Sequence, residues 1–244
     1  MGTLTLPAYR GADTVHNYVL PIPYFAYHGE FLKADRHGVR GQIFDTDRLD
    51  LTISTAASPP TDSKDVAARD GMPDLKPSVE IGPELDITLW RGDGDIPFVK
   101  LRLPVRQAFT VERHPRDIGT IFSPNLNMDI HNAFGAGWSL GFVTGPIFAS
   151  ARQNGYFYSV APQYVTASRP AYAAAGGYGG WQFLMAVSKR FPSMWVGAYI
   201  RQDTLQGAVF AASPLVDRRS YTSAGLAVSW IFGHSDTLVE VDPE

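Results

Sequence analysis

Asp129 and His131 lie two positions apart in a segment that alternates between polar and apolar residues. Side chains alternate along a strand, so these two would share a face and could form an acid–base pair. A hydrolase would also need a nucleophilic serine beside the histidine. Ser123 shares the predicted face but would lie about 27 Å from His131, at ~3.4 Å per residue. Only a serine from a neighbouring strand could serve, so we predict a hydrogen-bonding role and no enzyme.

The same face carries an unbroken ladder of polar side chains. Its members are Ser123, Asn125, Asn127, Asp129 and His131, and apolar residues occupy most of the positions between them. The ladder is long and rich in amides for a face that meets bulk water. A polar, water-filled interior would suit it better.

Metal and thiol chemistry find no support in the sequence. The six histidines show no His-x-x-x-His spacing and no paired-carboxylate spacing, and cysteine is absent. Thiolate metal sites and disulfides are therefore excluded, and we predict neither a metal nor a cofactor.

A long hairpin over residues 79–107 is the clearest structural pattern. Its apolar face comprises Val79, Ile81, Leu85, Ile87, Leu89, Val99, Leu101, Leu103 and Val105. Its charged face comprises Glu80, Glu84, Asp86, Lys100, Arg102 and Arg106. If the turn centres on Asp93, Asp86 lies opposite Lys100, Glu84 opposite Arg102, and Glu80 opposite Arg106. In a soluble protein the apolar face would meet a core, whereas in an outer-membrane barrel it would meet lipid.

Inside a barrel, these charges could either select ions or block the passage. Because paired charges cancel each other's field, we favour a mostly closed interior over a selective pore.

The rest of the chain favours the membrane. About twelve strands are predicted (ten are possible), with no convincing helix, and residues 156–160 are taken as a strand end. The long loops are predicted at 57–78, 163–180 and 202–219, and the other connections are short. Such sorting of loops is typical of an outer-membrane barrel.

The tyrosines of the second long loop, Tyr164, Tyr172 and Tyr178, are a candidate recognition loop for a glycan or a protein.

The amino-acid composition further narrows the class of protein. Of the 244 residues, 45% are hydrophobic and only 18% charged, yet no run approaches the roughly 18 apolar residues of a membrane-spanning helix. Aromatic residues make up 12%, as aromatic girdles require. A net charge of −3 argues against nucleic-acid binding. The chain enters a strand-like segment at once, without a basic and apolar leader, as expected of a mature chain.

Three groups of segments together resemble the MipA/OmpV family of MltA-interacting outer-membrane proteins. The first is PAYRGAD at 7–13, followed by LPIPYFAY at 20–27. The second is YFYSV at 156–160, followed by ASRPAY at 167–172 and a Gly-Gly pair at 176–177. The third is SPLV at 213–216, followed by the strand at 225–232.

This resemblance implies an all-β fold: a closed, antiparallel, up-and-down transmembrane barrel over residues 1–232. Residues 233–244 extend past the aromatic residue on which the family usually ends, and we predict that they form a polar tail. It also implies location in the outer membrane of a Gram-negative bacterium, in contact with its lipid. The implied function is a scaffold that docks peptidoglycan-remodelling enzymes, namely a lytic transglycosylase and a peptidoglycan synthase. The alternative is a narrow porin-like channel or a receptor for a small solute.

Overall fold

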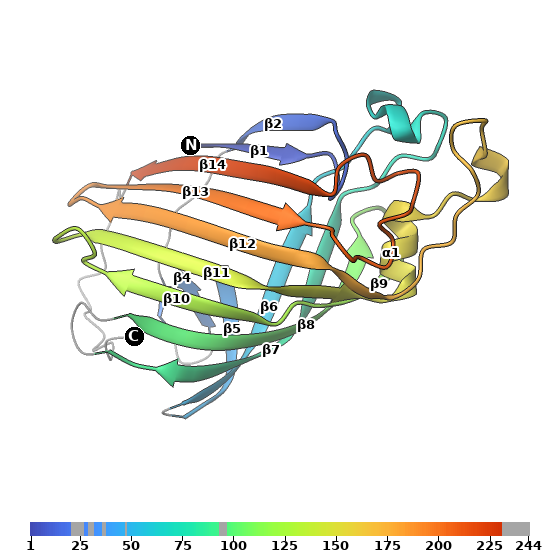
Figure 1. The fold of residues 1–244 in the computed structure, drawn as a ribbon. Helices are drawn as coiled ribbons and strands as arrows, with labels where there is room; N and C mark the ends of the chain where they lie inside the picture. The colour runs from blue at the N-terminus through green and yellow to red at the C-terminus, as the bar shows by residue number, and fades with distance from the viewer. Residues whose placement is uncertain (21–26, 29–31, 36–37, 47, 93–96, 231–244) are drawn as a thin grey trace.

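The computed structural model describes residues 1–20, 27–28, 32–35, 38–46, 48–92 and 97–230. Within these ranges the chain forms fourteen β-strands in one antiparallel sheet and one short α-helix (Figure 1). No helix among the described residues is long and apolar enough to cross a membrane.

The first half of the chain supplies strands β1 (Gly2–Pro7), β2 (Val15–Leu20), β3 (Tyr27–His28), β4 (Leu32–Asp35), β5 (Gly38–Asp45), β6 (Leu49–Ser58), β7 (Ser78–Trp90) and β8 (Phe98–Thr110). The second half supplies β9 (Asp117–Phe122), β10 (Asn125–His131), β11 (Trp138–Ala149), β12 (Gly177–Arg190), β13 (Met194–Thr204) and β14 (Ser220–Trp230). The helices are α1 (Ala151–Tyr158) and the 3-10 turns η1 (Ser63–Asp65), η2 (Ala67–Arg69) and η3 (Pro162–Tyr164).

Strands that follow one another along the chain are mostly neighbours in the sheet. The order is β2-β1-β14-β13-β12-β11-β10-β8-β7-β6-β5-β4-β3, so the pairing of β1 with β14 joins the two ends of the chain. This is the order of an up-and-down barrel, and Figure 1 shows the sheet curving round across its width. Its two outermost strands, β2 and β3, are joined by residues 21–26. That segment, which carries most of the LPIPYFAY motif at 20–27, lies outside the described residues, as does the predicted tail at 233–244.

The hairpin β7–β8 has its charged face buried and its apolar face exposed. Glu84 and Asp86 are 5% and 1% exposed, whereas Val79 and Ile81 are 42% and 48% exposed. Large apolar side chains are exposed on other strands as well, among them Phe122, Leu126, Phe183, Met185, Ile200 and Leu226. An apolar outer surface around a polar interior fits lipid and not water. The membrane alternative is therefore favoured over the soluble one.

The predicted register of this hairpin is wrong by two residues. Asp86 lies opposite Arg102 and Glu84 opposite Pro104, so Lys100 faces Thr88 and not Asp86. A shift of two residues keeps every side chain on its predicted face, whereas a shift of one would invert the strand. The alternation of residue types therefore predicted the faces and, despite the shifted register, two of the three ion pairs, Glu84 with Arg102 and Glu80 with Arg106.

Residues 151–158 form helix α1, so the prediction of no helix and of a strand end at 156–160 is wrong. The Oγ of Ser150 caps this helix by accepting a hydrogen bond from the backbone N–H of Gln153 (3.3 Å). The polar ladder, predicted to be unbroken over residues 123–131, is interrupted because the chain breaks at Ser123 and Pro124 into β9 and β10. Both pieces lie between β8 and β11, so together they occupy one position in the sheet.

Long connections gather at one end of the sheet, as predicted. Residues 8–14, 59–77, 150–176 and 205–219 pack together there into a unit that we call the cap, at the right of Figure 1. Its hydrophobic core comprises Ala8, Tyr9, Ala12, Val66, Leu75, Tyr158, Ala174, Leu205, Ala208 and Phe210. The long loops are thus not loose polar excursions, because they bury a core of their own.

Candidate functional site

An ion-pair network occupies the buried face of β7 and β8. Arg102 contacts Glu84 through Nη2 (2.8 Å) and Asp86 through Nε (3.3 Å). Lys100 contacts Asp50 of β6 (3.6 Å), so the predicted pairing of Asp86 with Lys100 is wrong. The register explains the exchange, because it brings Arg102 level with Asp86 and moves Lys100 toward the end of the hairpin.

Arg106 ties several strands together. Its Nε donates to Glu80 (3.0 Å), Nη1 to the hydroxyl of Ser54 (3.2 Å), and Nη2 to the hydroxyl of Ser123 (3.1 Å). One guanidinium thus bridges β6, β7 and the break between β9 and β10. A planar, permanently charged group with several donors is suited to such cross-linking. The part of these charges in lining or closing an interior passage stays a prediction.

Members of the polar ladder bond mostly to one another or to backbone. Asn127 Nδ2 donates to Asp129 Oδ2 (3.2 Å), and Asn125 Nδ2 donates to the carbonyl of Ser123 (2.9 Å). Ser139 of β11 is the register partner of His131 and is the neighbouring-strand serine that a hydrolase would require. Asp129 accepts a hydrogen bond from Asn127, so these two residues form part of a hydrogen-bonded ladder, and the absence of an enzymatic role stays a prediction.

At least one segment from each of the three groups that carry the family resemblance lies in the cap, and these segments contact one another there. The Tyr9 hydroxyl donates to the carbonyl of Leu215 (2.8 Å), and the Tyr158 hydroxyl donates to the carbonyl of Arg10 (2.9 Å). Ser213 Oγ donates to the carbonyl of Tyr158 (2.7 Å). Burial raises the pKa of both tyrosines well above the usual value. They are therefore neutral donors at physiological pH, and the segments hold one another in place.

The candidate recognition tyrosines do not form one free loop. Tyr178 lies within β12 and packs edge-on against Phe148, with ring centroids 5.8 Å apart. The Tyr172 hydroxyl donates to the carbonyl of Val209 (3.3 Å), and Tyr172 packs against the core of the cap. Tyr164 lies in η3 and is half-buried. A role in recognition stays a prediction for all three.

A buried ionic cluster beneath the cap was missed by sequence reasoning. Asp203, which is fully buried, receives Arg201 Nε (2.6 Å) and Arg10 Nη2 (3.3 Å), and Arg10 Nε donates to the hydroxyl of Tyr221 (3.0 Å). The cluster fastens the cap to β13 and β14. Arg10 and Asp203 are 193 positions apart, so no local spacing could reveal their contact.

The family model described as "MltA-interacting protein MipA" matches residues 1–232, nearly the whole chain. The chain belongs to the MipA family. It is also 25% identical over 214 residues to the outer membrane protein OmpV of Vibrio cholerae, an alignment that covers 85% of this chain and 76% of OmpV. No solved structure matches the chain.

Membership of the MipA family, together with the OmpV relative, places the protein in the outer membrane of a Gram-negative bacterium. That location explains the exposed apolar surface of the strands, since lipid covers it. The relative is described as an outer-membrane protein, and neither description names an enzymatic activity.

Proposed function

We propose that the protein is an outer-membrane scaffold that docks peptidoglycan-remodelling enzymes, namely a lytic transglycosylase and a peptidoglycan synthase. The observation that carries the proposal is the match over residues 1–232 to a family described as MltA-interacting, MltA being a lytic transglycosylase. A scaffold needs a rigid body in the membrane and an exposed surface that a partner can reach.

Rigidity is supported by the buried contacts. Arg102 and Arg106 cross-link the strands on the charged face, and the cap packs over one end. In both features polar groups bond to one another, whereas the polar groups that line an open, water-filled passage would contact water. They favour a fixed body over a wide pore.

The docking surface would be at the end opposite the cap. In bacterial barrels the long loops face outward and the short turns face the periplasm, where peptidoglycan lies. The short turns 132–137 and 191–193 are at that end. Phe134 projects there with 66% exposure, and its ring stands edge-on to Trp138, with centroids 6.0 Å apart. Exposed aromatic side chains of this kind are the usual anchors of protein interfaces.

A narrow channel or a receptor for a small solute is the second candidate. One observation favours it: residues of β10 to β14 line a cavity of about 390 Å³. A channel would conduct ions in a planar bilayer, and exchanging Arg102 and Arg106 together for alanine would raise that conductance. A scaffold of the kind proposed would show little conductance.

The test of the scaffold is solubilisation of native envelopes in mild detergent, isolation of the protein, and identification of bound proteins by mass spectrometry. Recovery of a lytic transglycosylase in near-stoichiometric amount, reproduced with the two purified proteins, is the expected result. If only lipid and assembly factors are recovered and the purified proteins do not associate, the scaffold is wrong.

A further inference from the structure

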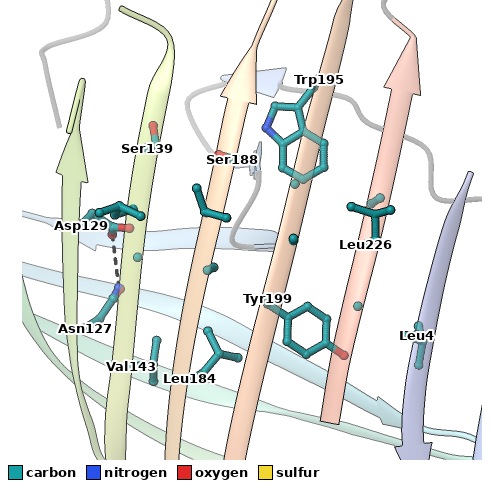
Figure 2. Close-up of a pocket in the computed structure, with 18 of the residues that line it drawn as sticks. Leu4, Asn127, Asp129, Ser139, Val143, Leu184, Ser188, Trp195, Tyr199 and Leu226 are labelled. Carbon is teal, nitrogen blue, oxygen red and sulfur yellow. Dashed lines mark hydrogen bonds between the residues drawn. The ribbon is translucent and has the colours of Figure 1, made fainter. Parts of the chain in front are cut away.

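A groove lies on the outer face of the sheet, beside the turn that joins β12 to β13. It measures about 320 Å³, and its lining includes Trp138, Lys189 and Val196, which are register partners on β11, β12 and β13. Residues opposite one another in an antiparallel sheet share a face. Ser188, the neighbour of Lys189, lines the cavity on the inner face (Figure 2). Because side chains alternate along a strand, Lys189 lies on the outer face.

The groove is at the edge of the membrane-facing surface. Along β12 toward the cap, the next outer residues are Val187 and Met185, and Met185 is 40% exposed. Toward the short turns, the outer surface carries the aromatic side chains of Trp138, Phe191 and Trp230. Aromatic residues mark the boundary between membrane and water on a barrel. The groove therefore lies at the depth where lipid headgroups meet acyl chains.

Lys189 supplies the charge of the groove. Among the described residues that line it, no other is charged. Lys189 Nζ lies 4.8 Å from the ring centroid of Trp138 and 5.1 Å from that of Phe191, so the two rings hold the ammonium by cation–π contacts. Within the described part of the chain, no acceptor bonds to Nζ, and Nζ is not one of the fully buried atoms that lack a partner. Its N–H donors can therefore reach an anion outside the protein.

We infer that this groove binds one phospholipid with an acidic headgroup from the periplasmic leaflet, the leaflet that the short turns of a bacterial barrel face. The headgroup phosphate bonds to the ammonium of Lys189, and an acyl chain lies along Val187, Val196 and Ala198. Charge complementarity selects an acidic headgroup. No carboxylate in the described lining offsets Lys189, whereas a zwitterionic lipid brings an ammonium of its own.

This inference rests on the location in the outer membrane and not on the scaffold role. The lining of the groove does not include Phe134, the residue that the docking proposal uses. Lipid binding can therefore be tested without a partner enzyme, and its failure would leave the scaffold proposal untouched.

Native mass spectrometry of the full-length protein, refolded in detergent micelles, tests the preference for an acidic lipid. The probes are phosphatidylglycerol and phosphatidylcholine with the same acyl chains, because the two differ in the headgroup alone. One basic residue near the membrane surface favours an acidic lipid by a factor of about five. We expect one phosphatidylglycerol to remain bound, with about a fivefold preference over phosphatidylcholine. Equal retention of the two lipids would overturn the site.

Two substitutions assign the preference to Lys189. Lys189→Gln removes the charge and should abolish the preference, whereas Lys189→Arg should keep it. Lys64→Gln is the matched control, because Lys64 lies on the cap with its side chain 76% exposed. A preference that persists in Lys189→Gln, or an equal loss in Lys64→Gln, would contradict the assignment.

A second pair of substitutions tests the groove itself, independently of its charge. Ala198→Trp fills the groove and should weaken the retention of both lipids. Ile200→Trp changes the next outer residue of β13, which is 46% exposed and outside the lining, and should leave retention unchanged. Full retention of phosphatidylglycerol by a folded Ala198→Trp protein would show that the lipid binds elsewhere.

Discussion

Tyr158 and Phe210 lie face to face in the cap, with ring centroids 3.8 Å apart and planes inclined by 7°. They come from different connections, since Tyr158 ends α1 and Phe210 lies between β13 and β14. Both are almost fully buried. This stack is the central contact through which the long loops form one unit.

Replacing Phe210 with alanine should loosen the cap without unfolding the sheet. Loss of a fully buried aromatic ring costs about 3–5 kcal/mol, and the neighbouring strands would retain their ladders. Limited proteolysis should then cleave within 150–176 and 205–219 while the strands survive in detergent. Tyr164→Ala is the control, because Tyr164 is half-buried and outside the core of the cap. Equal protease resistance in Phe210→Ala and the wild type would argue against a packed cap.

The cap should also respond to alkaline pH. Burial raises the pKa of Tyr9 and Tyr158, so the folded state holds these protons more tightly than the unfolded state does. The stability they contribute is complete below pH about 10, the pKa of an unperturbed tyrosine, and is lost as the pH rises through the higher folded values.

Absorbance of tyrosinate measures this effect directly. At least two of the eleven tyrosines, Tyr9 and Tyr158, should titrate late or only as the cap opens, and Tyr158→Phe should remove one late-titrating group. Ordinary titration of all the tyrosines near pH 10, with the protein still folded, would contradict the burial.

Arg102→Ala should destabilise the sheet strongly. The change leaves Glu84 and Asp86 buried without their main partner, and removing one member of a buried pair typically costs about 3–5 kcal/mol. Urea unfolding of the detergent-refolded protein, followed by tryptophan fluorescence, measures the loss. Arg116→Ala is the control, because its pair with Glu112 is largely solvent-exposed and should contribute little. Similar midpoints for the two variants would mean that the network does not hold the strands.

The hairpin at 79–107 shows how far alternation can predict a structure. Because the side-chain period is two, the sequence separated the lipid-facing residues from Glu84, Asp86 and Arg102 correctly. The same period makes registers that differ by two residues hard to distinguish, so the partner of Lys100 was wrong. Lys100 instead pairs with Asp50, which lies on a different strand. A pattern that considers only the two strands of the hairpin could not predict this pair.

Contacts between distant segments could not be predicted in the same way. Helix α1 has only eight residues, among them Gln153 and Asn154, which are polar yet buried, so it shows no apolar stripe. The cap and the Arg10–Asp203 cluster depend on residues far apart along the chain. The groove beside Lys189 depends on side chains from β11, β12 and β13, which the register of the sheet brings together. Such sites follow from tertiary packing, which leaves no local pattern.

Docking at the short-turn end is tested most directly by the affinity of the purified protein, embedded in lipid nanodiscs, for a purified lytic transglycosylase. Phe134→Ser should weaken binding at least tenfold, as expected for loss of an exposed aromatic anchor. Val165→Ser, an exposed apolar residue on the cap at the opposite end, should leave the affinity unchanged. Binding that survives Phe134→Ser and is lost in Val165→Ser would place the partner on the wrong end of the barrel. No binding by the wild-type protein would contradict the scaffold itself.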